Sequence, residues 1–233
     1  MPAPPVSPDR YEAVLFDLDG VLTSTTALHA TCWKATFDPL LARWGQAPFD
    51  AAREYLDHVD GKPRADGVRD FLRSRGAVLP DDRVEAIGER KQALVEHALA
   101  RDGVAAFPGS VRWIEQLRRA GVRTAVVTSS ANGPAVLRAA GIDRHFELTV
   151  DGHDVTRLGL RGKPAPDGFL AAARRLGVPA ARAVVVEDAL SGVAAGRAGE
   201  FGLVIGVARN VAPAELRAAG ADLVVADLGE LAA

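Results

Sequence analysis

The feature that most constrains this chain is a series of short apolar runs that alternate with helix-like stretches. Each run has three to five residues and ends in a polar or glycine-containing loop. Continuous apolar runs of this kind are typical of strands in a parallel sheet that helices cover on both faces. The five runs are residues 13–16, 124–127, 183–186, 203–207 and 223–225.

Helical patterns between these runs complete a set of strand–helix units. Several of the patterns are followed directly by glycine, the usual residue just past the end of a helix. We expect helices around residues 110–120, 133–140, 166–176, 190–199 and 213–219. Repeated strand–helix units predict an α/β, doubly wound domain with a parallel sheet.

A long stretch without a convincing strand interrupts this rhythm after the first run. Its helical patterns lie at residues 27–43, 48–58, 66–75 and 82–101. About 80 residues of helix are too many for an ordinary connection between two strands. We therefore expect a helical domain at 25–106, inserted into a core formed by 11–24 and 107–233.

Composition and charge exclude several classes of protein. The chain carries 28 Lys and Arg residues against 30 Asp and Glu, which argues against a broad surface for nucleic acid or anionic membrane. No apolar run reaches the roughly 18–20 residues of a membrane helix, and the N-terminus lacks the pattern of a signal peptide. Four prolines in the first eight residues predict a flexible tail at 1–10. We expect a cytoplasmic monomer.

Candidate functional residues follow the predicted strands, because ligands of open α/β sheets bind beyond the carboxyl ends of the strands. Asp17 and Asp19 come after the first run, where two carboxylates at i and i+2 lie on one side of an extended chain. An ordinary Asp-Gly turn is the alternative. Thr128, Ser130 and Asn132 come after the second run, as a phosphate site or as a helix cap.

Two further segments strengthen the functional interpretation. Lys163 lies between a glycine and a proline just before a helix, in a loop that lacks the P-loop pattern. Glu187 and Asp188 close the run at 183–186. Several carboxylates, one lysine and several hydroxyls at neighbouring strand ends suit Mg²⁺ together with a phosphate group.

These four segments, in this order, resemble the motifs of the haloacid-dehalogenase superfamily of phosphoryl-transfer enzymes. The resemblance covers residues 11–230 and is strongest to the β-phosphoglucomutase-like subgroup with a helical cap. It implies a Rossmann-like α/β core with a parallel sheet and an inserted α-helical cap domain. It also implies that Asp17 is a nucleophile that becomes aspartyl phosphate and that Asp19 is the general acid/base.

The resemblance assigns the phosphoryl group and the metal as well. Thr128 and Lys163 would hold the transferring phosphoryl group. The Mg²⁺ ligands would come from Asp17, Asp19 (through its backbone carbonyl), Glu187 and Asp188. An ordinary Asp has a pKa of about 3.9, so Asp19 needs an environment that lets it carry a proton when it acts as an acid.

In the cap, the resemblance extends to residues that would choose the substrate. Thr25 matches a hinge position, and His29 matches a histidine that positions the acid/base. The remaining matches are Arg64 and Lys91 in the cap, with Ser130 and Asn132 in the core. Trp33, at i+4 from His29, lies on the same helix face and is a further candidate for contact with the substrate. Packing between cap and core is the alternative for His29 and Trp33, and a solvated helix face is the alternative for Lys91.

Two departures from the subgroup's pattern affect the expected substrate site. Ser24 stands where the family commonly has aspartate, and Ala131 stands where the mutase commonly has lysine. The second change removes a positive charge from the expected site of the distal phosphate. Lys62, in the nearby cap loop, is a candidate replacement.

The resemblance implies Mg²⁺-dependent phosphoryl transfer through an aspartyl phosphate. The expected reaction converts β-D-glucose 1-phosphate to glucose 6-phosphate, so the partner is a small phosphorylated sugar. One alternative is a phosphatase of small sugar phosphates. Another is a silent binding module, which the intact set of Asp17, Asp19, Lys163 and Asp188 argues against.

Overall fold

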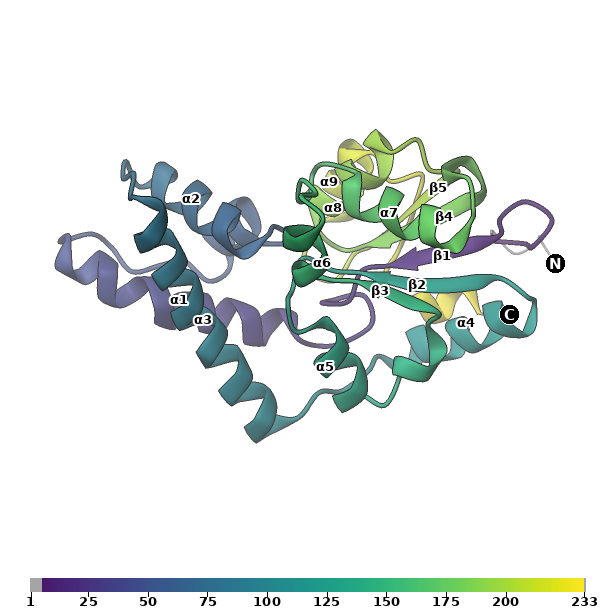
Figure 1. Ribbon diagram of the computed structural model, residues 1–233, viewed down its shortest axis with the longest axis horizontal. Coiled ribbons are helices and arrows are strands. Elements are labelled where there is room, and N and C mark those ends of the chain that lie inside the picture. Colours follow the sequence, from purple (N-terminus) through teal and green to yellow (C-terminus); the bar gives the residue numbers. More distant parts are fainter. Residues whose placement is uncertain (1–5, 233) are drawn as a thin grey trace.

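The computed structural model describes residues 6–232, and its core is a six-stranded parallel sheet in the order β3-β2-β1-β4-β5-β6 (Figure 1). The central strand β1 lies between β2 and β4, with Val14 in register with Thr124 and Val184. The strands are β1 (Ala13–Phe16), β2 (Arg123–Val127), β3 (Leu148–Val150), β4 (Ala183–Glu187), β5 (Leu203–Val207) and β6 (Leu223–Val225).

The α/β prediction is confirmed, and the five predicted strands are all present within one residue. The sequence analysis missed β3, a three-residue edge strand with two half-buried side chains. A segment this short carries no periodicity that separates it from a loop. The helix α6 (Gly152–Arg157), which follows β3, was missed for the same reason.

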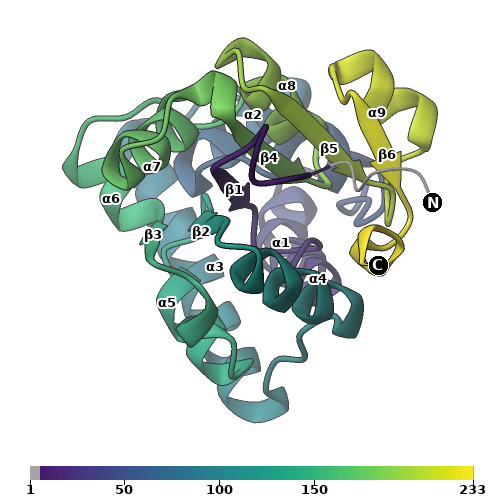
Figure 2. The same ribbon diagram turned by 90° about the vertical axis from the view of Figure 1, so that its right-hand side faces the viewer.

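Helices cover both faces of the sheet, because side chains along each strand point alternately to opposite sides. Val14 and Phe16 of β1 pack with α4 (Pro108–Arg119) and α5 (Gly133–Ala139). Ala13 and Leu15 pack on the opposite face with α7 (Asp167–Leu176) and α8 (Leu190–Ala198). Figure 2 shows the two pairs of helices on either side of the sheet. The last helix, α9 (Pro213–Ala219), packs beside β5 and β6.

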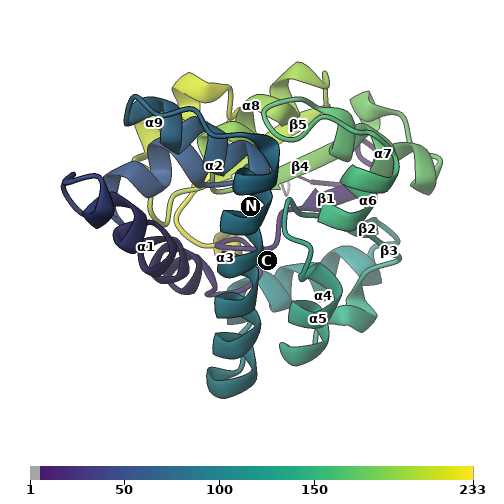
Figure 3. The same ribbon diagram turned by 60° about the vertical axis from the view of Figure 1, so that its left-hand side comes forward.

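The inserted helical segment forms a second lobe with its own core (Figures 1 and 3). The long helix α3 (Asp81–Asp102) packs against both α1 (Thr26–Arg43) and α2 (Arg64–Ser74). Phe37 lies at the centre of an aromatic cluster, stacked on Trp33 at 5.0 Å and close to Phe71 at 4.2 Å. This cluster forms a hydrophobic core for the cap lobe that is separate from the clusters packed on the sheet.

The segment expected to be a helix at 48–58 is shorter than predicted. Its helical part ends as a π-helical turn, Tyr55–Val59. The Asp50 carboxylate accepts hydrogen bonds from the backbone N–H groups of Ala52 and Arg53 and so caps a turn at 51–52, after which the helical residues begin.

Two chain segments connect the lobes and lie side by side. Ser24 donates its backbone N–H to Ala105, and Thr23 pairs with Ala106 in an antiparallel bridge. The predicted tail at 1–10 lies partly outside the described residues, which begin at Val6. Val6 is buried against the α4 side of the core. None of the helices in residues 6–232 has the length and apolar character needed to cross a membrane.

Candidate active site

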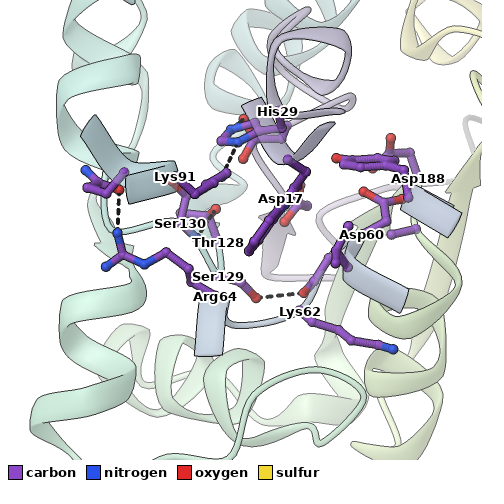
Figure 4. A pocket seen from close by; sticks show the side chains of 17 residues that line it. Asp17, His29, Asp60, Lys62, Arg64, Lys91, Thr128, Ser129, Ser130 and Asp188 are labelled. Carbon is purple, nitrogen blue, oxygen red and sulfur yellow. Dashed lines mark hydrogen bonds and ion pairs between the residues drawn. The ribbon is translucent and has the colours of Figure 1, made fainter. Parts of the chain in front are cut away.

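The predicted site residues gather in one pocket between the carboxyl ends of the strands and the cap (Figure 4). Those that line it are Asp17, Asp19, His29, Trp33, Arg64, Lys91, Thr128, Ser130 and Asp188. The remaining ones lie behind this lining as buried partners of the same groups: Thr25, Asn132, Lys163 and Glu187. Side chains from both lobes therefore face one space.

The turn after β1 depends on Gly20. Asp17 continues the sheet, with its backbone N–H donating to Val186 at 2.9 Å. Three residues later Gly20 adopts φ +85°, and a Cβ there would lie 1.9 Å from Asp188 Oδ2. Only glycine combines this backbone conformation with such a close approach. The Asp-Gly pair is thus a turn, and the turn brings the Asp17 and Asp188 segments together.

Lys163 links the carboxylates of two strands. Its Nζ lies 2.5 Å from Asp17 Oδ1 and 2.5 Å from Glu187 Oε1, and it donates to the Val127 carbonyl at 3.2 Å. Burial alone would lower the pKa of Lys163, but the two carboxylates outweigh burial and raise it. Lys163 therefore remains a cation inside the site and is placed to contact an anion bound against Asp17.

The carboxylates of Asp17, Glu187 and Asp188 offer oxygens that all lie within 4.8 Å of one another. Burial, together with the neighbouring acids, raises the pKa of Asp188 well above its usual range and that of Glu187 to about 8. The raised pKa values mean that ionising all three carboxylates beside a single ammonium group is unfavourable without a further positive charge. Hard oxygen donors in this state fit a divalent cation such as Mg²⁺.

The Asp19 carboxylate turns away from that cluster toward the cap. Thr25 Oγ1 donates to Asp19 Oδ1, and His29 Nε2 lies 3.2 Å from the same oxygen. Any contribution of Asp19 to a cation would therefore have to come from its backbone carbonyl, as the resemblance implies. Burial would raise the pKa of Asp19, but His29, Thr25 and Lys91 oppose burial and lower it to about 2.

Lys91 completes a chain of hydrogen bonds that starts at Asp19. Its Nζ lies 2.7 Å from His29 Nδ1 and 5.1 Å from the centre of the Trp33 ring. An ammonium group only donates, so Nδ1 accepts and His29 carries its proton on Nε2, facing Asp19. Lys91 is 8% exposed, in contrast to the solvated helix face considered from sequence. Burial lowers its pKa to about 8.

Arg64, Gln92 and Asn132 connect cap and core at the other end of the pocket. Arg64 Nη1 donates to Gln92 Oε1 at 2.9 Å, and Gln92 Nε2 donates to Asn132 Oδ1 at 2.6 Å. The Asn132 backbone N–H donates to Ser130 Oγ at 3.2 Å. The sequence analysis missed Gln92, because a glutamine within a mixed-charge helix has no distinguishing signal. Only the docking of α3 on the core reveals its position.

The loop after the π-helical turn closes the pocket. Ser129 Oγ donates to the Gly61 carbonyl at 2.7 Å, and Ser191 Oγ donates to the Asp60 carbonyl at 3.1 Å. Two different strand ends of the core thus hold one cap loop. Lys62 also lines the pocket, but its Nζ pairs with Asp70 at 2.6 Å and its side chain points away from Asp17 (Figure 4).

Comparisons with known proteins agree with this arrangement. The sequence profile of the haloacid dehalogenase-like hydrolases matches residues 11–199. A "Beta-phosphoglucomutase" of Mycobacterium bovis is 48% identical over 96% of this chain and 92% of that protein.

Two solved structures share the fold over nearly the whole chain. A hydrolase from Pseudomonas syringae has a TM-score of 0.81 and 27% identity, covering 94% of this chain and 95% of its own. CbbY from Rhodobacter sphaeroides, in complex with phosphate, has a TM-score of 0.75 and 31% identity, covering 95% of this chain and 96% of its own.

Proposed function

The chain belongs to the haloacid dehalogenase-like hydrolase family, and on that premise we propose that it isomerises β-D-glucose 1-phosphate to glucose 6-phosphate. The similarity to β-phosphoglucomutase over nearly the full length supports this substrate. The observation that carries the proposal is the pocket itself, where the Asp17–Lys163 end of the core faces a cap that contributes Arg64, His29 and Lys91. A mutase has to hold a phosphorylated sugar at both of its ends.

The phosphoryl group would be transferred to and from Asp17. An Asp17 oxygen forms the new bond to phosphorus while the bond between phosphorus and the sugar oxygen breaks. Lys163 and Thr128 are placed to bind the oxygens of the group in transit. We propose Mg²⁺ as the cofactor, held by Asp17, Glu187 and Asp188, where it would offset the negative charge of the phosphoryl group.

Asp19 would act first as a base. Its low pKa leaves it ionised in the free protein, so it can accept the proton of a sugar hydroxyl that attacks the phosphorylated Asp17. The sugar is then a bisphosphate and Asp19 carries a proton. After the bisphosphate turns over, Asp17 attacks the other phosphorus and Asp19 returns the proton to the leaving oxygen. The proton that acid catalysis requires is thus supplied by the substrate.

The same proton transfers serve a phosphatase, in which water replaces the sugar hydroxyl as the group that attacks the phosphorylated Asp17. The second candidate is a phosphatase of small sugar phosphates. The contacts of Arg64 favour it, because they leave less positive charge for a second phosphate group. Its Nη2 lies 3.4 Å from the Glu89 carboxylate, and Ala131 adds no charge beside it.

Two products distinguish the candidates. We would supply β-glucose 1-phosphate, Mg²⁺ and a trace of glucose 1,6-bisphosphate, and follow glucose 6-phosphate and free phosphate in parallel. A mutase yields glucose 6-phosphate with little free phosphate. Free phosphate without glucose 6-phosphate would establish the phosphatase instead. Asp17→Asn should abolish either reaction while leaving the circular dichroism spectrum unchanged, and retained turnover would refute the role of Asp17.

A further inference from the structure

Arg209 contacts both of the chain segments that link the core to the cap. It lies two residues past the end of β5 and outside the pocket lining described above. Its Nε donates to the Gly20 carbonyl at 2.8 Å, in the linker that leads into the cap. Its guanidinium carbon lies 3.6 Å from the centre of the Phe107 ring, in the linker that returns to the core. One side chain thus touches both linkers.

A carboxylate holds the guanidinium group of Arg209 in place. Nη2 of Arg209 lies 3.0 Å from Asp227 Oδ2, and Asp227 Oδ1 accepts the backbone N–H of Gly229 at 2.7 Å. Gly109 leaves room for this carboxylate, because a Cβ there would lie 1.7 Å from Asp227 Oδ1. The Arg209 side chain is 18% exposed. An ion pair, a ring contact and a hydrogen bond together fix one planar group, which suits arginine and not lysine.

The two linkers are bonded to each other directly beside Arg209. The Phe107 backbone N–H donates to the Leu22 carbonyl at 2.9 Å, and Thr23 pairs with Ala106 in an antiparallel bridge. Arg209 contacts the core-side end of each linker. It therefore determines where the bonded pair leaves the core, and hence where the cap begins.

The turn that Arg209 contacts also carries Asp19. Asp19 directly precedes Gly20, whose backbone N–H donates to the Thr23 carbonyl at 2.8 Å. After this turn, Thr25 and His29 approach the Asp19 carboxylate from the start of the cap. A displacement of about 1 Å between reacting groups can lower a rate about 100-fold. The position of the linkers therefore decides how well Asp19 meets its partners in the cap.

We propose that Arg209 is a positioning residue, which fixes the core-side ends of both linkers and thereby holds Asp19 against Thr25 and His29 for proton transfer. This inference rests on the proposed function in one respect, the acid/base role of Asp19. Arg209 touches no reacting atom, so its loss should act through the placement of other groups. The effect should fall on turnover more than on the stability of the fold.

Steady-state kinetics with β-glucose 1-phosphate and Mg²⁺ gives the first test, with glucose 6-phosphate and free phosphate both counted as products. We expect Arg209→Ala to lower kcat about 10- to 100-fold. The matched control is Arg112→Ala. Arg112 is an exposed arginine of α4 that also lies near Asp227, but among residues 6–232 it has no hydrogen bond or ion pair with either linker. Its removal should leave kcat unchanged.

Chemical rescue distinguishes positioning from a general loss of stability. Guanidinium chloride at concentrations far below those that unfold the protein should restore part of the kcat of Arg209→Ala, because the ion can occupy the space beside Phe107 and Asp227. Guanidinium weakens folding, so a gain in kcat cannot come from stabilisation. Potassium chloride at the same ionic strength should restore nothing.

A double-mutant cycle tests the route by which Arg209 acts. If Arg209 brings His29 to Asp19, its removal should cost much less in a protein that already lacks the His29 ring. We therefore expect the losses of kcat in Arg209→Ala and His29→Ala to combine to less than their product. Hydrogen exchange at the Phe107 amide gives a readout without turnover, and Arg209→Ala should accelerate it.

Three results would overturn the inference: an unchanged kcat in Arg209→Ala, losses that multiply fully in the double variant, or rescue that potassium chloride gives equally well. Isomerisation that is indifferent to Arg209 would remove this inference and keep the proposed function. Free phosphate as the only product would replace the mutase with the phosphatase, while the same kcat comparison still decides the role of Arg209. If neither product forms, the proposed function fails, and unchanged exchange at the Phe107 amide would then overturn this inference too.

Discussion

Replacing Lys91 with methionine should make the protein more stable and less active. Lys91 is almost fully buried on α3, and burial lowers its pKa from 10.5 to about 8. Each tenfold change in an acid dissociation constant is about 1.4 kcal/mol, so holding the charge in the folded protein costs on the order of 3 kcal/mol. Methionine has a similar length, packs against Trp33 and carries no charge.

The dependence on pH follows from the sign of this shift. The folded-state pKa lies below the unfolded one, so the folded protein binds the Lys91 proton less tightly. The penalty is present in full below pH 8 and disappears as the pH rises from about 8 to 10.5. Lys91→Met should therefore raise the free energy of unfolding by about 1–3 kcal/mol at pH 7. The gain should shrink at pH 9.5.

Activity should change in the opposite direction. Lys91 donates to His29 Nδ1, which fixes the His29 proton on the side of Asp19. Without this donor we expect kcat/KM to fall about 10- to 100-fold, as for the loss of a charged hydrogen bond. In the unmodified protein, kcat/KM should fall as the pH rises through about 8, and this alkaline limb should be absent in Lys91→Met.

Urea unfolding at pH 7 and 9.5, together with the pH profile of kcat/KM, tests the reasoning. The matched control is Arg90→Met, which removes an exposed charge from the same helix and should change neither quantity appreciably. A Lys91→Met protein that is less stable than the parent at pH 7, or one that keeps the alkaline limb, would refute the account of Lys91.

Three other predictions concern the cap, the interdomain connection and the metal cluster. Phe37→Ala should lower the free energy of unfolding by about 3–5 kcal/mol, because Phe37 is fully buried among aromatic rings, whereas Phe37→Leu should cost much less; urea titration measures both. Arg209→Ala removes a cation–π contact with Phe107 and a hydrogen bond to the Gly20 carbonyl, so we expect a clear fall in kcat with a smaller loss of thermal stability. Steady-state kinetics and thermal unfolding measure the two quantities, and an unchanged kcat would contradict the prediction. Gly192→Ala would place a Cβ 1.8 Å from Glu187 Oε1, so a higher Mg²⁺ concentration should be needed for half-maximal stabilisation against heat, and an unchanged requirement would refute this reason for glycine.

Several features of the fold were readable from local sequence because they rest on local physics. Strands such as Ala183–Glu187 are continuous apolar runs, and helices such as α7 end at a glycine in the left-handed conformation, Gly177. Such signals depend only on neighbouring residues. The short edge strand β3 and the late start of the helix before Tyr55 escaped notice, because a few residues carry too little pattern.

The core of the candidate site was also readable, since its acids and lysine lie at strand ends and parallel strands bring those ends to one edge of the sheet. What the acids do there was not readable. The pKa of Asp19 is set by His29 and Thr25, which approach it only when α1 lies against the core. Burial and charge neighbours are properties of packing, and no spacing along the chain reports them.

The sequence by itself thus determined the alternating sheet and helices, the insertion of a helical lobe, and the residues gathered at the strand ends. The tertiary structure alone decided that Lys91 is buried beside His29, that Gln92 joins Arg64 to Asn132, and that Asp60 faces the pocket. Each of these contacts joins the cap to the core or two helices of the cap. Their residues are far apart in sequence, so only the packing of the cap helices on one another and the docking of the cap on the core bring them together.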